Sequence, residues 1–156
     1  RCGVGRGDGH GGRGGADVTR VRPGHPADLG PLGPAQAALT EPAPELLAGA
    51  LTREGPATVL VAVDGDPVGY LVAVPGPEVA YVPELAVRPD RQREGHGSAL
   101  LSALVERTTA DELRLTVAAD DEAARGFYEH HGFTLRTRIP DRFAAGDGLL
   151  LARTVP

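Results

Sequence analysis

The chain has 156 residues, of which 41% are hydrophobic, and this length and composition indicate one globular domain with a substantial core. Its sixteen basic residues, all arginine, are outnumbered by twenty-one acidic residues, a balance that argues against general nucleic-acid binding. The single cysteine, Cys2, excludes a disulfide framework and a cysteine-based metal site, and no apolar run approaches the ~20 residues of a membrane span. We therefore expect a cytoplasmic location.

A glycine-rich tail opens the chain. Residues 1–16 lack hydrophobic periodicity, so we expect them to be disordered and the folded domain to span residues 17–156. Beyond the tail, short elements alternate, with a strong hairpin signal where β-branched residues flank Asp64-Gly65. In chain order the first half predicts a strand at 18–22, a helix at 25–39 interrupted by Gly30, Pro31 and Pro34, a helix at 44–51, paired strands at 58–63 and 68–74, and a strand at 80–87 in which Pro83 indicates a bulge.

Residues 84–97 are the most informative segment. A short apolar strand, 85–87, leads into a charged turn with Arg88, Arg91 and Arg93, and then into a Gly-x-Gly pair before an amphipathic helix at 98–109. In this order of elements, the unpaired backbone N–H groups at the start of the helix point toward the glycine turn. Such a group of N–H donors is suited to binding a phosphate. The chain has no lysine for a Walker-type loop, and Leu100 stands where a dinucleotide fingerprint requires a third glycine. An ordinary strand-to-helix turn remains an alternative on this segment alone.

A second motif follows a predicted strand at 113–118. Acidic residues at 120–122 suit a helix start and Gly132 suits the position just past the helix end. Ala124, Phe127, Tyr128 and His131 fall at helical spacing on an inward face, and by spacing alone Tyr128 and His131 are more typical of packing than of chemistry. Strands at 134–139 and 149–154 complete the chain.

Together the two motifs resemble the GNAT superfamily of acetyl-coenzyme A-dependent N-acyltransferases. The run from Gln92 to Gly97 is similar to that family's pyrophosphate loop, Q/R-x-x-G-x-G/A, and the Ala-x-x-Phe-Tyr128-x-x-x-Gly-Phe133 run is similar to its second signature. The segment 138–151 resembles the end of the protein N-terminal acetyltransferase subgroup, which includes ribosomal-protein alanine acetyltransferases. The resemblance implies an α/β (α+β) fold: a mixed, mostly antiparallel sheet of six to seven strands, helices on both faces, and a splay between the fourth and fifth strands.

The resemblance also implies a site for acetyl-CoA as co-substrate. By the resemblance, Tyr128 protonates the leaving thiolate. Glu84 is assigned from its position: it is the carboxylate best placed beside strand 85–87 to accept the proton of the amine through water, with a solvated strand residue as an equal alternative. The N–H of Val87 is expected to polarise the thioester carbonyl. The pantetheine arm is expected to pair with the free edge of strand 85–87. No metal is expected, and the cofactor-binding residues are Leu85, Ala86, Val87, Gln92, Arg93, Glu94, Gly95, His96, Gly97, Ser98, Asp121 and Tyr128.

Three residues depart from the family pattern. Thr116 stands on the strand where the subgroup usually has a catalytic glutamate, and Asp121 replaces the usual asparagine seven residues before the tyrosine. Asp121 therefore either lies near an anionic cofactor or caps the helix. His96 replaces a small or aliphatic residue, and we expect its side chain to be exposed on the turn.

Three functions follow from these motifs. The first is acetyl transfer to a primary amine, with a protein or peptide N-terminus as the leading acceptor. The second is transfer to a small amine such as an amino acid, polyamine or aminoglycoside. Glu41, Glu45 and Glu54 would attract a cationic amine, although a solvated helix face explains them equally well. The third is a non-catalytic acyl-CoA-binding module, which the threonine at 116 favours. In each case the expected protein is a monomer or homodimer without a membrane or a specific nucleic-acid partner.

Overall fold

The computed structural model describes residues 19–39 and 41–156, so the predicted disordered tail at 1–16 lies outside the described residues. One seven-stranded sheet organises the chain, in the order β1-β2-β3-β4-β5-β7-β6. Every neighbouring pair is antiparallel except β4 and β5, which are parallel. The elements are β1 Arg20–Pro23, η1 Pro26–Asp28, α1 Gly33–Ala37, α2 Pro44–Leu51, β2 Thr58–Asp64, β3 Asp66–Val74, β4 Val79–Val87, η2 Pro89–Arg91, α3 His96–Arg107, β5 Glu112–Ala118, α4 Glu122–His130, β6 Thr134–Phe143 and β7 Gly146–Thr154.

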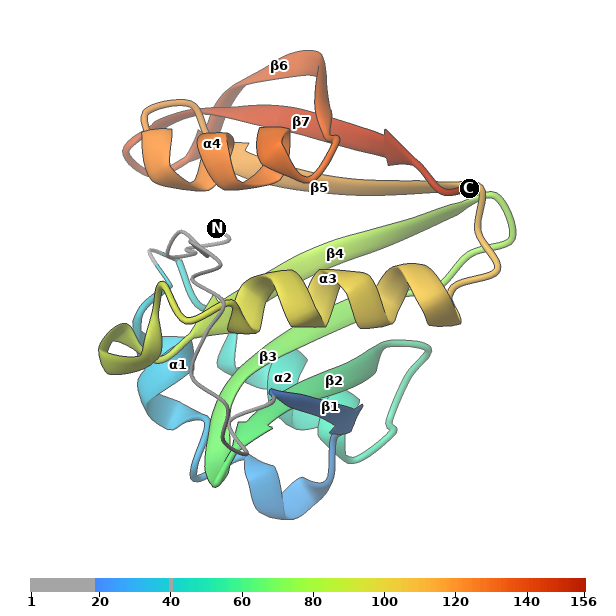
Figure 1. Cartoon of the computed structure of the whole chain (residues 1–156). Coiled ribbons are helices and arrows are strands. Elements are labelled where there is room, and N and C mark those ends of the chain that lie inside the picture. The colour runs from blue at the N-terminus through green and yellow to red at the C-terminus, as the bar shows by residue number, and fades with distance from the viewer. Residues whose placement is uncertain (1–18, 40) are drawn as a thin grey trace.

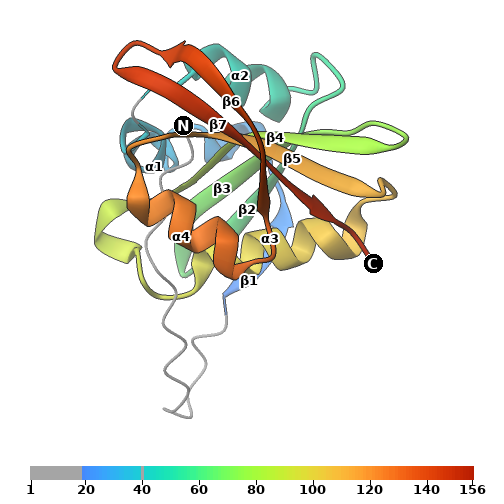
Figure 2. The ribbon, with the colours of Figure 1, turned by 90° about the horizontal axis from the view of Figure 1, so that it is seen from above.

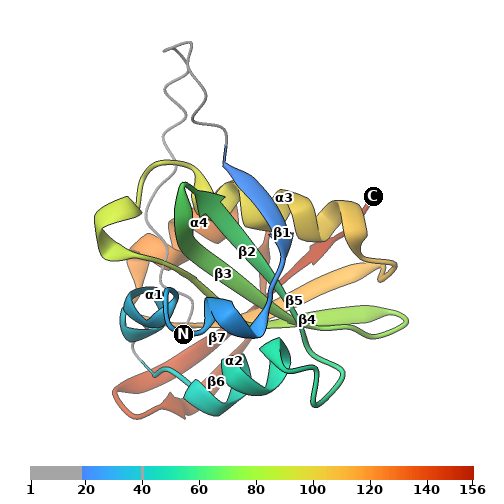
Figure 3. The ribbon, with the colours of Figure 1, turned by 90° about the horizontal axis from the view of Figure 1, so that it is seen from below.

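Helices cover both faces of this sheet, as predicted. Views from above and below place α3 and α4 on one side of the strands and α2 on the other (Figures 2 and 3). Two buried clusters match this arrangement: one joins the leucines of α3 and the aromatic residues of α4 to the sheet, and the other joins α1 and α2 to the opposite face. The predicted amphipathic character of α3 is confirmed, because Leu100, Leu101 and Leu104 are buried while Ser102 and Glu106 are exposed.

The sheet separates between β4 and β5, and this places the site. Their parallel ladder contains only the pairs from Val79 to Tyr81, opposite Glu112 to Arg114. Beyond Tyr81 the two strands diverge, and the turn between β4 and α3 lies at the end where they are apart (Figure 1). The predicted bulge at Pro83 is confirmed, because the register with β3 shifts by one residue between Glu84 and Tyr81. The predicted splay between the fourth and fifth strands is therefore present.

Most element boundaries agree with the sequence predictions, and three differ. The helix expected at 25–39 is divided into η1 and α1, because Gly30 and Pro31 interrupt it. The helix expected from Ser98 begins two residues earlier, at His96. The last two strands are longer than expected and form an antiparallel hairpin from Thr134 to Thr154. The register of this hairpin shifts at two points. Among the described residues, no helix combines the length and apolar character that crossing a membrane requires.

Candidate active site

The turn between β4 and α3 has the geometry that the glycine motif predicts. Gly95 has a φ of +89° and is the N-cap of α3, without a side-chain cap. Arg93 also has a positive φ, of 66°, so the backbone coils tightly before the helix begins. The first N–H groups of a helix lack intrahelical acceptors, and here they follow a residue with no side chain to cover them. The turn can therefore present main-chain donors to an anionic group.

The side chains of this turn are mostly paired within the protein. Gln92 donates from Nε2 to the carbonyl oxygen of Val87, 3.1 Å away, which ties the turn to the end of β4. Arg88 forms two hydrogen bonds with Asp90, and Arg91 contacts both Glu94 and Asp64. The positive charge expected from these two arginines is thus largely neutralised. The main-chain N–H groups and Arg93, which forms no ion pair among the described residues, remain for an anion.

The edge of β4 beyond Tyr81 faces the separation of the sheet. Arg88 donates its N–H to Val68 of β3, and N–H directions alternate along a strand. The N–H groups of Leu85 and Val87 therefore point away from β3, toward the side where the ladder with β5 has ended. The hydrogen bond from Gln92 to the Val87 carbonyl agrees with this direction. An extended, amide-bearing ligand could add to this edge as a strand does.

Glu84 is buried on the α1 and α2 side of β4, with 2% of its surface exposed. Its Oε1 accepts a hydrogen bond from the Tyr70 hydroxyl and its Oε2 one from the Ala43 N–H, each 2.9 Å long. Burial raises the pKa of Glu84 above its ordinary value, while these two hydrogen bonds oppose the rise. The two hydrogen bonds therefore hold the Glu84 carboxylate in one orientation, and its pKa is shifted upward, toward neutral pH. A general base requires both properties.

Tyr128 is a residue of α4 and is fully buried. It lies in the cluster on the opposite face of the sheet, together with the leucines of α3. Its ring makes edge contacts with Phe127 at 5.1 Å and with Phe133 at 5.4 Å, which fix the direction of the hydroxyl. Leu85 belongs to the same cluster, whereas Glu84 next to it faces the other way. The structure thus places the two predicted proton-transfer groups on opposite faces of β4, at its diverging end.

Three predicted site residues have roles within the protein itself. Asp121 is the N-cap of α4 and accepts a hydrogen bond from the N–H of Ala124 at 3.1 Å, which is the capping alternative. Ser98 is bonded through Oγ to Nε2 of His131, 2.9 Å away, which joins the first turn of α3 to the end of α4. The expectation that His96 is exposed is wrong: it is 3% exposed, because it is the first residue of α3 and its Nδ1 is bonded to the hydroxyl of Thr19.

Sequence reasoning missed the partners of the site. Tyr70 and the main chain of Ala43 were not expected beside Glu84, and only the β3–β4 register, in which Val72 pairs with Glu84, would have indicated Tyr70. Thr116, one of the three expected departures from the family pattern, is buried on β5 and bonded to the Tyr81 hydroxyl at 2.6 Å. Its hydroxyl therefore takes part in a hydrogen bond within the sheet.

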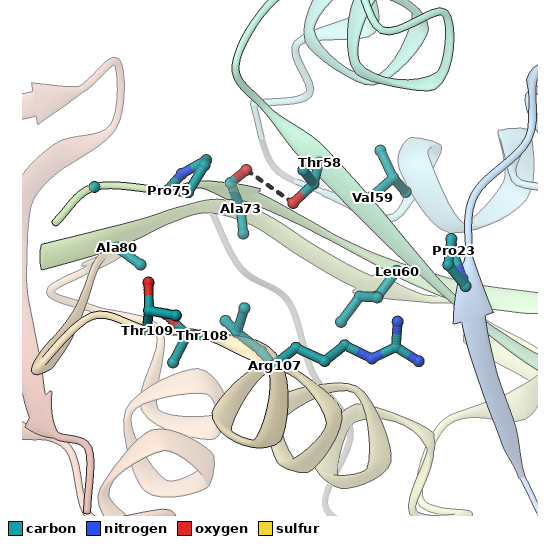
Figure 4. A pocket seen from close by; sticks show the side chains of 12 residues that line it. Pro23, Thr58, Val59, Leu60, Ala73, Pro75, Ala80, Arg107, Thr108 and Thr109 are labelled. Carbon is teal, nitrogen blue, oxygen red and sulfur yellow. Dashed lines mark hydrogen bonds between the residues drawn. The ribbon is translucent and has the colours of Figure 1, made fainter.

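A well-formed pocket lies elsewhere on the molecule. It has a volume of about 350 Å³, and its lining includes Leu60, Ala80, Arg107 and the threonines at 58, 108 and 109 (Figure 4). Arg107 is the last residue of α3, so this pocket lies one helix length, or about 18 Å, from the glycine turn at the other end. The pocket is therefore separate from the candidate active site.

Comparison with known families agrees with the fold. A family model described as the acetyltransferase (GNAT) family matches residues 31–133, and the chain belongs to this family. Ard1 from Thermoplasma volcanium has a similar structure, with a TM-score of 0.80 at 25% identity over 88% of this chain and 98% of that one. The ribosomal-protein-S18-alanine N-acetyltransferase from Escherichia coli gives 0.77 at 22% identity, over 88% and 94% of the chains. Arabidopsis thaliana NAA60 in complex with acetyl-CoA gives 0.75 at 16%, over 88% and 99%. A search of curated proteins finds no match.

Substitution of Gly95 tests the turn. We expect Gly95→Asp to weaken acetyl-CoA binding at least about tenfold, because an N-cap carboxylate would occupy the helix N–H groups and repel a diphosphate. An added Cβ meets nothing within 4 Å, so the loss would not come from a steric clash.

Two control variants accompany this substitution. Gly95→Ala measures the cost of the positive φ alone, and Gly55→Asp, at an exposed position with open space, adds the same charge elsewhere. Calorimetric titration of acetyl-CoA into the three variants reports the result. Undiminished binding by Gly95→Asp would contradict the assignment.

Proposed function

We propose that this protein transfers an acetyl group from acetyl-CoA to a primary amine, namely the N-terminal α-amine of a protein or peptide, by direct attack in a ternary complex. The observation that carries the proposal is the position of Glu84. This buried carboxylate directly precedes Leu85, where the edge of β4 is no longer paired with β5. Family membership supports the acetyltransferase chemistry. One similar structure is by name an alanine N-acetyltransferase acting on a ribosomal protein, and this favours a protein acceptor.

Binding of the acyl donor uses main-chain groups. The N–H groups of residues 92–98 hold the diphosphate at the start of α3, with Gly95 and Gly97 permitting close approach. The N–H and C=O groups of Leu85, which point away from β3, pair with the pantetheine amides, whereas those of Ala86 are directed at β3. The thioester carbonyl then lies beside Val87, whose N–H points away from β3 and stabilises the negative charge that develops on the oxygen.

Two side chains move the protons. Glu84 accepts the proton that the amine loses as its nitrogen attacks the thioester carbonyl carbon, directly or through one water. Tyr128 donates its phenolic proton to the sulfur as the carbon–sulfur bond breaks, and a tyrosine is protonated at pH 7 because its ordinary pKa is about 10. Their placement on opposite faces of β4 keeps the acid and the base apart.

The acceptor side is bounded by two chain segments. Ala43, which donates to Glu84, follows Glu41, whose Oε1 accepts the N–H of Ala144 in the turn between β6 and β7 at 2.8 Å. This connection joins the segment before α2 to the terminal hairpin beside the base. Both are loop segments with main-chain polar groups, which is the kind of surface that recognises an extended peptide end.

An acceptor panel tests the proposal. The full chain is assayed for thiol release from acetyl-CoA with peptides that carry a free α-amine, the same peptides with a blocked N-terminus and one internal lysine, and a polyamine. We expect turnover with the free α-amine only. Turnover with the polyamine alone would establish the small-amine alternative. Cofactor binding with no transfer to any amine would establish the non-catalytic module.

A further inference from the structure

Three potential metal ligands meet behind the glycine turn. Asp64 ends β2, Glu94 lies in the turn, and His96 is the first residue of α3. One ligand atom from each side chain lies within 4.8 Å of those of the other two. We propose that this Asp64–Glu94–His96 cluster is a binding site for a zinc-like divalent cation. The site uses side chains rather than the main-chain N–H groups of the turn, so it does not depend on the proposed function.

The histidine is the observation that points to a ligand. Its side chain is 2% exposed, and Nδ1 lies 2.8 Å from the hydroxyl of Thr19, a bond that fixes the plane of the ring. Nε2 has no hydrogen-bond partner among the described residues. The carboxylate oxygen Oε1 of Glu94 is 3.7 Å from it, within ion-pair distance but beyond hydrogen-bond range. A buried polar atom that is oriented but unsatisfied requires an explanation, and a cation between Nε2 and the carboxylate supplies one.

The distances and ligand types select the metal. Zinc binds imidazole nitrogen and carboxylate oxygen at about 2.0–2.2 Å in a tetrahedron, whose ligand atoms are therefore about 3.4 Å apart. The 3.7 Å separation of the histidine and glutamate atoms is close to this value. Asp64 must approach by a further ångström or so, and it stands at a hairpin turn beside Gly65. Calcium and magnesium prefer a shell of oxygen ligands, whereas one imidazole with two carboxylates and water suits zinc or a similar ion.

Arg91 is the competing explanation for the two carboxylates. Its guanidinium contacts Asp64 through Nη2, and its Nε is 3.0 Å from both oxygens of Glu94. An ion-pair network therefore accounts for the acidic residues, but it leaves Nε2 of His96 unsatisfied among the described residues. A metal and the guanidinium would compete for the same negative charge. The two explanations make opposite predictions for Arg91→Gln, because removal of the competing cation should strengthen metal binding.

Metal titration of the full chain tests the site without any acyl donor. Zinc is titrated by calorimetry, and cobalt(II) is added to detect the visible absorption of a tetrahedral site. We expect one ion per chain, a loss of more than about tenfold in affinity for Asp64→Asn and for Glu94→Gln, and a gain in affinity for Arg91→Gln. These three replacements are near-isosteric or at partly exposed positions, so the fold should persist, and a His96→Gln variant reports on the third ligand.

Matched controls locate the ion. Asp66→Asn changes an exposed carboxylate of the same hairpin, and His130→Gln changes an exposed histidine, so both should bind zinc as the parent protein does. A Cys2→Ser, His10→Gln variant removes the cysteine and the histidine of the N-terminal segment. Absence of stoichiometric binding would overturn the proposal. So would binding that survives Asp64→Asn and Glu94→Gln, or that is lost only in the Cys2 and His10 variant.

Discussion

Replacement of Tyr128 by phenylalanine should lower kcat by about 10²- to 10⁴-fold while leaving the affinity for acetyl-CoA unchanged. The substitution removes one hydroxyl and keeps the ring, whose edge contacts with Phe127 and Phe133 should preserve the packing of α4. Without the phenolic proton, the departing sulfur leaves as an unprotonated thiolate, so that the breakdown step becomes slow. Single-turnover kinetics and calorimetric titration of acetyl-CoA separate the loss in chemistry from any loss in binding.

The matched control for this variant is Tyr81→Phe. Tyr81 also bears a hydroxyl near the diverging strands, bonded to Thr116 at 2.6 Å, but it has no part in the proposed proton transfer. We expect Tyr81→Phe to cost a small fraction of the loss seen for Tyr128→Phe. Equal losses would indicate that the hydroxyls act through the packing of the sheet. Turnover by Tyr128→Phe at the parental rate would exclude Tyr128 as the acid.

The glycine turn and the architecture could be predicted from the sequence because their causes are local. Gly95 has the positive φ that only glycine adopts freely, and the 3.6-residue period of the leucines defines the buried face of α3. Pro83 within a strand predicted a bulge, and the register confirms one. The proline and glycine residues between 25 and 39 predicted interruptions, although not where η1 and α1 would begin.

The surroundings of the site residues could not be predicted, because they come from distant parts of the chain. The donors to Glu84 are 14 and 41 residues away from it, and the hydroxyl that fixes His96 is 77 residues away. A single sequence shows neither the β3–β4 register nor the position of the segment before α2. For the same reason Asp64 could not be linked to Glu94 and His96, and the single cysteine excluded only a cysteine-based metal site.

Replacement of Glu84 by glutamine should lower kcat/KM at pH 7 by about 10²- to 10⁴-fold and should abolish the acidic limb of the pH–rate profile. Burial raises the pKa of this carboxyl, so the parent enzyme should lose activity as the pH falls through a value above the ordinary 4.5 of a glutamate. Glutamine occupies the same space beside Tyr70 and Ala43 but cannot accept the proton of the amine. A parental acidic limb in the variant would assign the base to another group. Glu106→Gln, at an exposed position on α3, is the control and should leave the profile unchanged.

Stability measurements on the same variant separate its chemical role from a structural one. Because the pKa of Glu84 is raised in the folded state, that state binds more protons than the unfolded chain between the ordinary and the raised pKa. The contribution of this carboxyl to folding is therefore largest below its ordinary pKa and declines as the pH rises through the raised value. A neutral glutamine removes the cost of ionising a buried group. Glu84→Gln should accordingly have the reduced kcat/KM at pH 7 yet lose less stability than the parent protein between acidic and neutral pH, as urea unfolding at both pH values would show. Parallel loss of activity and stability would instead indicate that the two hydrogen bonds to Glu84 serve the fold, and that the amine is deprotonated elsewhere.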